Sequence, residues 1–394
     1  MFRRQVKYQP ERTRTFLGSP SVLRLPDGAL LVTHDYFGKG CPRNHENEES
    51  LTSVYRSEDD GNSWANITHI MNCYWSTLFL HEGSVYILGT SQQYGSIFIR
   101  RSDDGGFTWT HPVDDQTGIL FKGGPFWTPP SYHCAPVPVT VHNGRIYKGF
   151  EDCDPTIWGI GFQACVISAP VGADLLAAAN WTMSNKVKFN PEWTRPEWGE
   201  ARIPGWREGN VVADPDGQLW DVMTFEAAPL PDEKAPRLKI LDEGKRLEFD
   251  PETGFFDFPG SKAKFTLRRD PVTGKYLAIV NNLEQLDLLK AMAAAPSGAS
   301  TRLHQKHPFR QRNFSTLMAS DDLWHWRKVK ALVQDDSGLT PEDSLRLTGF
   351  QYVDWQFDGD NLIYVVRTAY RGAQNFHDSN QILFCVLEDF RKLL

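Results

Sequence analysis

Short apolar runs, many of them alternating with polar residues, follow one another along most of this chain, and helical periodicity is nearly absent. The runs are bounded by Gly, Pro, Asn and Asp, a pattern typical of β-strands joined by turns. One unit recurs: a strand, a turn of the Asp-Gly or Asn-Gly kind that suits a hairpin, and a second strand. Its six copies have their turns at Pro26–Gly28, Glu82–Gly83, His142–Gly144, Pro215–Gly217, Asp270–Gly274 and Asp358–Gly359.

Further strand-like sequence follows each pair of strands, so each unit holds four strands. Six such units predict an all-β fold, a six-bladed β-propeller with antiparallel blades that forms one domain over residues 1–394. A seventh blade could be hidden in the insertions at 112–130, 183–207 and 283–311. The last unit lacks a fourth strand, and we expect the segment before Gly18 to supply it and close the ring. One helical stretch is expected, over Leu283–Ala295.

Two octapeptides, Ser57–Trp64 and Ser102–Trp109, share the pattern S-x-D-x-G-x-[S/T]-W, and Ser320–Trp326 is a shorter copy. Ser and Asp side chains can bond backbone amides across a tight turn, and Gly can take a positive φ. The Trp can then pack beneath the hairpin. The pattern resembles the Asp-box of the sialidase-like β-propellers, and this resemblance implies the same fold.

Composition excludes several classes of partner. The net charge of −7 leaves no basic face for nucleic acid or an anionic membrane, and no apolar run is long enough to span a bilayer. The N-terminus does not resemble a signal peptide, so we expect a cytoplasmic protein, or a secreted one whose leader has been removed. The six cysteines show no C-x-x-C spacing, which favours buried free thiols over disulfides or metal ligands. We expect no cofactor and no metal.

A propeller places its small-molecule site on the axis, at the starts of the innermost strands and the ends of the second strands. These positions hold imidazoles, cations and carboxylates from all six units. The candidate catalytic residues are His34, His133, Tyr36 and Glu208. The candidate substrate-binding residues are Asp35, Trp75, Glu151, Arg207, Lys264, Asn281, Arg312, Gln351, Arg367, His377 and Asn380.

This set of side chains fits an anionic sugar, uronic or ulosonic, that is held by cations and attacked by acid and base groups. We therefore expect an acidic oligosaccharide as the partner. Closure of the ring leaves no free sheet edge, so we expect a monomer. Trp193, Trp198 and Trp206 could form a wall on which a sugar stacks, although ordinary packing explains them equally well.

The chain resembles the sialidase superfamily over essentially its whole length. In sialidases three arginines bind the substrate carboxylate, a Tyr–Glu pair forms the nucleophile and an Asp is the acid. Here Leu17–Ser21 lacks the first arginine, and Phe350-Gln351 stands where the Tyr is expected, although Glu208 matches the Glu. The comparison therefore argues against sialidase activity on a sialidase-like scaffold.

A closer resemblance is to propellers that act on L-rhamnose-α-1,4-D-glucuronate and carry a catalytic His. It rests on four stretches: His34–Gly38, Tyr132–Pro136, Gly349–Trp355 and Asn375–Asn380. That group usually has seven blades. The resemblance implies a lyase in which His34 or His133 abstracts the C5 proton, and the other His or Tyr36 protonates the leaving oxygen. Arg207, Lys264, Arg312 or Arg367 would neutralise the uronate.

Two alternatives stay open. The first is a glycoside hydrolase of a non-sialidase kind, with Glu151 and Glu208 as the carboxyl pair. The second is a glycan-binding propeller without catalytic activity, because Asp-box proteins include proteins that are not enzymes. The density of ionisable groups at the axis favours an enzyme, since aromatic and amide groups alone would serve for binding.

Overall fold

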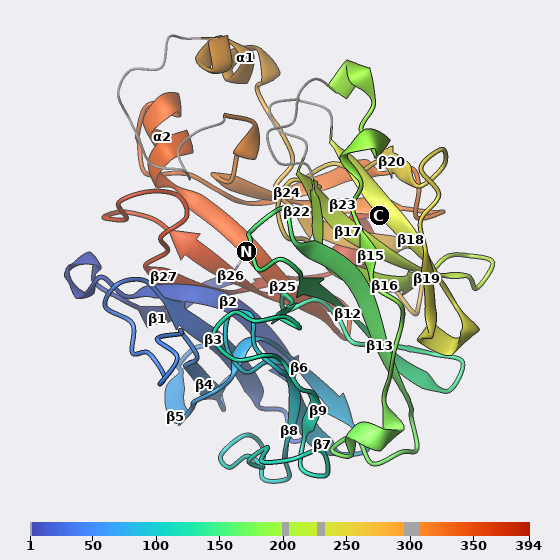
Figure 1. Ribbon diagram of the computed structural model, residues 1–394. Coiled ribbons are helices and arrows are strands. Elements are labelled where there is room, and N and C mark those ends of the chain that lie inside the picture. Colours follow the sequence, from blue (N-terminus) through green and yellow to red (C-terminus); the bar gives the residue numbers. More distant parts are fainter. Residues whose placement is uncertain (1, 199–204, 227–232, 295–307) are drawn as a thin grey trace.

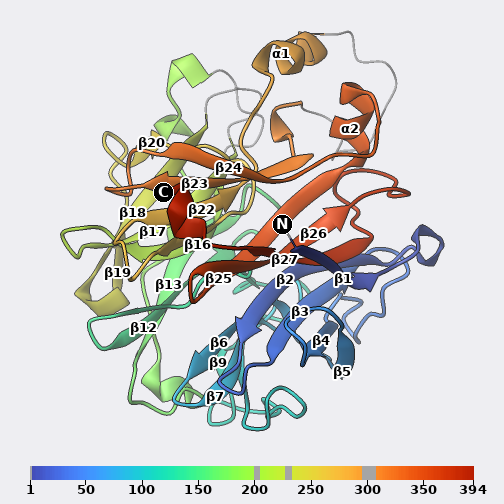
Figure 2. The same ribbon diagram turned by 180° about the vertical axis from the view of Figure 1, so that it is seen from behind.

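The computed structural model describes residues 2–198, 205–226, 233–294 and 308–394, and in them six antiparallel sheets follow one another around a common axis (Figure 1, Figure 2). The prediction of an all-β, six-bladed propeller is confirmed. Parts of two predicted insertions, 199–204 and 295–307, lie outside the described residues. We number the blades 1 to 6 in the order of their innermost strands.

The first three blades follow one another along the chain. Blade 1 contains β2 (Phe16–Arg24), β3 (Leu30–Phe37), β4 (Thr52–Ser57) and β5 (Ala65–Ile70). Blade 2 contains β6 (Tyr74–His81), β7 (Ser84–Thr90), β8 (Ile97–Ser102) and β9 (Ile119–Phe121). Blade 3 contains β10 (Tyr132–His133), β11 (Thr140–His142), β12 (Arg145–Cys153), β13 (Phe162–Pro170), β14 (Thr182–Met183) and β15 (Val187–Lys188).

The other three blades complete the ring. Blade 4 contains β16 (Gly205–Ala213), β17 (Leu219–Glu226), β18 (Lys234–Leu241), β19 (Arg246–Glu248) and β20 (Phe255–Asp257). Blade 5 contains β21 (Thr266–Arg269), β22 (Tyr276–Val280), β23 (Phe314–Ser320) and β24 (Arg327–Gln334). Blade 6 contains β25 (Gly349–Asp358), β26 (Asn361–Ala369), β27 (Gln381–Leu387) and β1 (Phe2–Tyr8).

Both α-helices of the described part of the chain lie in connections between strands. The two α-helices are α1 (Leu286–Ala294) and α2 (Pro341–Leu347). Helix α1 confirms the expected helical stretch, whose last residue, Ala295, lies outside the described residues. Single 3-10 turns are η1 (Glu11–Thr13), η2 (Ala178–Asn180), η3 (Pro191–Trp193), η4 (Pro196–Trp198), η5 (Asp242–Gly244), η7 (Pro308–Arg310) and η8 (Phe390–Leu393). None of the described helices combines the length and apolarity that crossing a membrane requires.

The N-terminal strand closes the ring. Strand β1 pairs antiparallel with β27, so that Arg3 lies opposite Cys385, and blade 6 has the order β1-β27-β26-β25. The prediction that the segment before Gly18 supplies the missing strand is therefore confirmed. Joining the two ends of the chain in one sheet ties the first blade to the last. The six cysteines are all buried and free, as expected.

The Asp-box turns form as their sequence predicts. In the first box Gly61 has a φ of 82°, and its N–H donates to Ser57 Oγ at 2.9 Å. The Trp64 indole donates to the carbonyl oxygen of Gly61 at 3.1 Å. In the short third box Leu323 takes the positive φ, and Trp326 donates to its carbonyl at 2.8 Å. In blades 1, 2 and 5 these turns join the third and fourth strands, at the end of the blade opposite the axial mouth.

A bulge near the start of the innermost strand prepares the site. The ladder register shifts after the first pair in β6 and after the third pair in β16 and β25, and one residue in each shift has a positive φ. These residues are Trp75 (φ 48°), Glu208 (φ 60°) and Tyr352 (φ 53°). A left-handed non-glycine residue costs roughly 1–3 kcal/mol and is typical of functional sites. The bulges thus mark one position that three blades share.

Candidate active site

Tyr352 and Glu208 form the centre of the site. The Tyr352 hydroxyl donates a hydrogen bond of 3.1 Å to Glu208 Oε1, although the two residues are 144 positions apart in the chain. Both occupy the bulge position, Tyr352 in blade 6 and Glu208 in blade 4. Burial raises the pKa of Tyr352, and the negative charge of Glu208 raises it further. The phenol therefore stays protonated until the carboxylate takes its proton.

Three arginines lie beside this pair. The guanidinium carbons of Arg367 and Arg312 lie 4.8 Å and 5.8 Å from the centre of the Tyr352 ring, and Arg207 is close enough to lower the pKa of Tyr352. Burial lowers the pKa of Arg310 to about 10, and the positive charges of Arg207 and Arg312 lower it further. Cations that are buried close together gain most from an anionic ligand. This half of the mouth is suited to a carboxylate.

Two of these arginines are held in place by neighbouring groups. Gln351 Oε1 accepts a hydrogen bond from Arg312, and Gln351 Nε2 donates to the Phe376 carbonyl at 2.6 Å. Arg367 donates to Ser379 Oγ at 3.1 Å and to the His377 carbonyl at 2.8 Å. Gln351 and His377, both predicted substrate-binding residues, therefore contact Arg312 and Arg367 and hold these side chains in place.

A His–carboxylate pair adjoins the centre on the other side. His133 Nδ1 lies 2.6 Å from Glu151 Oε2, and Glu151 Oε1 accepts the backbone N–H of Glu208, also at 2.6 Å. Burial lowers the pKa of His133 to about 3 and raises that of Glu151 to about 7, so the imidazole is neutral at neutral pH. His133 Nε2 has no hydrogen-bond partner among the described residues. Trp75 packs against His133 with ring centres 4.3 Å apart.

Carboxyls gather on the loop of blade 1 that follows β3. Glu49 accepts from Gly38 N–H and Tyr74, and Glu46 accepts from Gln92 and Phe126 N–H. Among the described residues, the Glu48 carboxyl accepts only from the Trp127 indole, at 2.6 Å. Burial raises the pKa of Glu48, and the charges of Glu49 and Glu46 add to this effect. The blade 1 loop thus brings three glutamates to the mouth, of which Glu49 pairs with Arg43 at 2.9 Å. The arginines near Tyr352 come instead from blades 4 and 6 and from the connection before β23.

Four of the predicted substrate-binding residues hold backbone groups. Asp35 accepts N–H groups of Ser19 and Trp75. Lys264 donates to the Val353 carbonyl at 2.8 Å, and burial lowers its pKa to about 7. Asn281 donates to the Phe314 and Phe350 carbonyls, and Asn380 bonds both backbone groups of Tyr370. Three of the four, Asp35, Lys264 and Asn281, join one blade to the start of the next.

The structure places His34 and Tyr36 away from the centre. His34 is fully buried, with its ring stacked on Tyr55 at 5.4 Å and packed against Tyr36 at 4.7 Å. Tyr36 belongs to the core between blades 6 and 1, and its hydroxyl accepts from Ser53. Strand alternation explains this placement, because Asp35 between them faces blade 2 and its two neighbours must face the opposite way. This geometry gives neither side chain a catalytic position.

Sequence reasoning missed Tyr352, Glu48 and two exposed tryptophans. The sequence comparison placed Phe350-Gln351 where the Tyr is expected, whereas in the structure the β25 bulge turns Tyr352, the next residue, toward Glu208. Trp198 and Trp206 are buried in the core of blades 3 and 4, where Trp193 also packs, so they form no wall at the surface. Trp127 and Trp158 are instead exposed on mouth loops.

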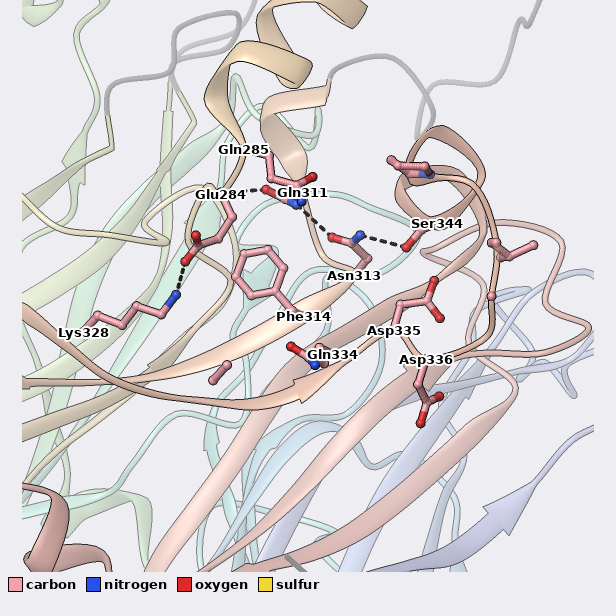
Figure 3. A pocket seen from close by; sticks show the side chains of 14 residues that line it. Glu284, Gln285, Gln311, Asn313, Phe314, Lys328, Gln334, Asp335, Asp336 and Ser344 are labelled. Atoms are coloured by element: carbon pink, nitrogen blue, oxygen red, sulfur yellow. Dashed lines mark hydrogen bonds and ion pairs between the residues drawn. The ribbon is translucent and has the colours of Figure 1, made fainter.

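A cavity of about 640 Å³ lies at the mouth end of blade 5, outside the Tyr352–Glu208 centre (Figure 3). A chain of amides runs along it: Glu284 N–H donates to Gln311, Gln311 to Asn313, and Asn313 to Ser344 at 2.8 Å. Gln311 and Asn313 flank Arg312 in sequence. The hydrogen bonds of Gln311 and Asn313 therefore fix the segment that carries Arg312, whose guanidinium lies near Tyr352.

Within the described residues, no three His, Cys, Asp or Glu side chains gather as a metal site would require. No protein-family model matches the chain, and no curated protein matches it. Solved structures do share its fold. They include an α-L-arabinanase from Penicillium chrysogenum complexed with arabinobiose, which is 14% identical with a TM-score of 0.58 and is aligned over 100% of this chain and 99% of that chain.

Two further solved structures share the fold. An α-L-arabinofuranosidase from Fusarium graminearum is 13% identical with a TM-score of 0.59, over 98% of this chain and 97% of that one. A Hadza microbial sialidase is 12% identical with a TM-score of 0.61, over 98% of this chain and 68% of that one. At such identities the likeness shows the six-bladed propeller fold alone.

Proposed function

We propose that the protein is a glycoside hydrolase that cleaves the glycosidic bond of an acidic sugar, with Tyr352 as nucleophile and Glu208 as its base. One observation carries the proposal: the Tyr352 hydroxyl contacts Glu208 at 3.1 Å amid Arg207, Arg312 and Arg367. The fold adds support, because structures that share it include an arabinanase with bound arabinobiose and a Trypanosoma rangeli sialidase with bound sialic acid.

The arginines support an acidic substrate. A guanidinium offers a planar pair of donors that matches a carboxylate, and it stays charged when buried. Arg312 and Arg367 are 7% and 4% exposed, so a carboxylate bound between them would be largely desolvated. Buried ion pairs of this geometry discriminate strongly against neutral analogues. We therefore propose a sugar whose carboxylate lies near the reacting carbon.

A phenol suits such a substrate better than a carboxylate nucleophile, because a second negative charge would repel the bound carboxylate. In the first step Tyr352 Oη forms a bond to the anomeric carbon while the bond to the leaving oxygen breaks. The phenolic proton passes to Glu208. In the second step water attacks the same carbon, Tyr352 leaves, and Glu208 returns the proton to it. Two displacements retain the anomeric configuration.

Glu48 is the residue we assign as the acid. The leaving oxygen needs a proton in the first step, so the donor must be a carboxyl that is protonated near neutral pH. Burial raises the pKa of Glu48, and a single hydrogen bond, from Trp127, reaches its carboxyl from the described residues. Asp35 also has a raised pKa, about 7, caused by burial, but backbone N–H groups occupy both of its oxygens. In the second step the Glu48 carboxylate takes the proton of the attacking water.

The test is turnover of a panel of aryl glycosides that carry ulosonic, uronic and neutral sugars. We expect cleavage of acidic members with retention of configuration, observed by proton NMR. A 2-fluoro or 3-fluoro glycoside of the active sugar should label Tyr352 covalently, as seen by peptide mass spectrometry. Preferential cleavage of neutral sugars, or labelling of a carboxyl instead of Tyr352, would overturn the proposal.

A second candidate is a lyase, favoured by the His133–Glu151 contact of 2.6 Å. A neutral imidazole oriented by a carboxylate can abstract the C5 proton of a uronate, as in cleavage of an L-rhamnose-α-1,4-glucuronate linkage. The reaction leaves a double bond that absorbs in the near ultraviolet. Release of rhamnose from gum arabic with this absorbance, and loss of both in His133→Ala, would establish the lyase. Release without absorbance favours the hydrolase.

A further inference from the structure

We propose that Trp127 and Trp158 form a stacking platform for an uncharged sugar ring on the leaving-group side of the site. This inference rests on the proposed function, and it deepens that function by naming the substrate as an acidic sugar linked to a neutral one. We call the two indoles the rim platform.

Exposure is the first observation. Trp127 is 46% exposed and Trp158 is 44% exposed. Such exposure is high for tryptophan, because its large apolar surface is unfavourable in contact with water. Trp127 lies on the connection from β9 to β10, and Trp158 lies on that from β12 to β13. Both connections are at the mouth end of the blades, where Glu151 and His133 also lie.

Both tryptophans are held by specific contacts. The Trp127 indole donates to Glu48 at 2.6 Å, its carbonyl accepts from Thr156 at 2.8 Å, and its ring lies 5.5 Å from that of Tyr94. Trp127 also has a positive φ of 61°, a strained conformation that these contacts maintain. A ligand that stacks on a fixed ring loses less free energy to ordering than one that stacks on a mobile ring.

The neighbours of Trp158 connect the platform to the reacting centre. The Trp158 ring lies 5.5 Å from that of His133 and 5.1 Å from that of Phe162. The guanidinium carbon of Arg207 lies 5.3 Å from its centre. Arg207 belongs to the arginine group beside Tyr352, so Trp158 borders the bound acidic sugar.

The charges and hydrogen-bonding groups beside Trp127 indicate which sugar binds on the two indoles. Trp127 lies against Glu48, the proposed acid, so the group next to it is the one whose oxygen receives the proton. The carboxyl of Glu46 would repel an anionic ring, whereas the carboxyls of Glu46 and Glu48 can form hydrogen bonds with the hydroxyls of a neutral one. The C–H face of a pyranose or furanose buries apolar surface on an indole. A neutral sugar in the leaving group fits all three conditions.

The test compares two substrates that carry the same acidic sugar, a glycosyl fluoride and a disaccharide whose second unit is neutral. In Trp127→Ala and Trp158→Ala we expect KM for the disaccharide to rise about tenfold relative to KM for the fluoride. Trp127→Phe keeps an aromatic face and should restore most of the ratio. Phe107→Ala is the matched control, since Phe107 is 48% exposed on an Asp-box loop at the opposite end of the blades.

Binding of lactose and arabinobiose, followed by quenching of tryptophan fluorescence, gives a readout that needs no turnover. We expect quenching that Phe107→Ala preserves and that the double variant of Trp127 and Trp158 loses. If the fluoride is hydrolysed but neither the KM ratio nor the quenching differs from the control, the platform is overturned while the proposed function stands. If no acidic substrate is cleaved yet the quenching is lost as expected, the proposed function fails and the platform stands.

Discussion

A Cβ atom added to Gly18 would lie 1.4 Å from Oδ1 of Asp35. Asp35 fills this space because its carboxylate accepts the N–H of Ser19 at 2.9 Å and that of Trp75 at 3.0 Å, which ties blade 1 to blade 2. Gly18 stands at the β2 register shift that corresponds to the bulges of Trp75, Glu208 and Tyr352. Blade 1 therefore has no room for an arginine side chain at the position where sialidases are expected to carry one.

Gly18→Ala should destabilise the fold. The methyl group must displace the Asp35 carboxylate and break a bond between blades, so we expect the free energy of unfolding to fall by about 1–3 kcal/mol. Urea denaturation measures this loss. Gly172→Ala is the control, because a Cβ there meets no atom within 4 Å. Equal stability of the two variants would show that the site adjusts freely around Asp35.

Removal of the Tyr352 hydroxyl should abolish hydrolysis. We expect kcat to fall by about 10²–10⁴-fold in both Tyr352→Phe and Glu208→Gln. Tyr352→Phe loses the nucleophile, and Glu208→Gln loses the base that takes its proton. Tyr370→Phe also removes a hydroxyl from a mouth loop, one that donates to Asp336, and it should keep activity. Steady-state kinetics with circular dichroism as the folding control decides this. Near-normal kcat in Tyr352→Phe would rule out the nucleophile assignment.

Glu48→Gln tests the proposed acid through the leaving group. A glutamine cannot donate the proton, so glycosides with poor leaving groups should lose about 10²–10⁴-fold in rate. Those with nitrophenolate or fluoride leaving groups need little protonation and should lose far less. Burial raises the pKa of Glu48 above that of a free glutamate, so the decline of kcat/KM on its alkaline side should begin at a higher pH than for a free carboxyl, and the variant should lose that decline. Equal losses for all leaving groups would contradict the assignment.

The sequence predicts the ring of blades much better than it predicts which side chains meet at the axis. Asp-box and hairpin patterns are local, so they predict six units. Because the last unit lacks a fourth strand, the N-terminal segment, Phe2–Tyr8, is then expected to supply it. The side chains at the site depend on bulges. The extra residue in the β25 bulge turns Tyr352, rather than Gln351, toward Glu208. No local pattern reports such a shift. Strand alternation likewise sends His34 into the core and leaves Asp35 to bind backbone.

His34→Ala is therefore expected to act on stability rather than on chemistry. The imidazole is fully buried and stacked on Tyr55, and its removal opens a cavity that should cost about 2–5 kcal/mol. Thermal unfolding measures the loss. At a temperature where the variant is folded, kcat should stay within a few-fold of normal. A folded His34→Ala protein without turnover would return this histidine to the list of catalytic residues.

Asp221 should make stability depend on pH in the direction opposite to that of an ordinary ion-paired carboxylate. Its side chain is fully buried, and neither oxygen has a hydrogen-bond partner among the described residues. Burial raises the pKa of Asp221 well above its usual value, the charge of Glu151 raises it further, and Lys148 only partly compensates. The folded state thus holds a proton that the unfolded state releases above about pH 4.

Stability contributed by the neutral carboxyl is consequently lost as pH rises above about 4 toward the raised pKa of the folded state. Asp221→Asn stays neutral at every pH, so its free energy of unfolding relative to wild type should increase steadily between pH 4 and pH 8. Asp270→Asn is the control of opposite sign. Burial would raise the pKa of Asp270, but hydrogen bonds, chiefly from Arg391, lower it to about 2, so this variant should lose stability at neutral pH and little at pH 2. Urea denaturation of both variants across this range tests the sign. If the free energy of unfolding of the wild type instead rises relative to that of Asp221→Asn as pH rises, Asp221 is ionised in the folded protein.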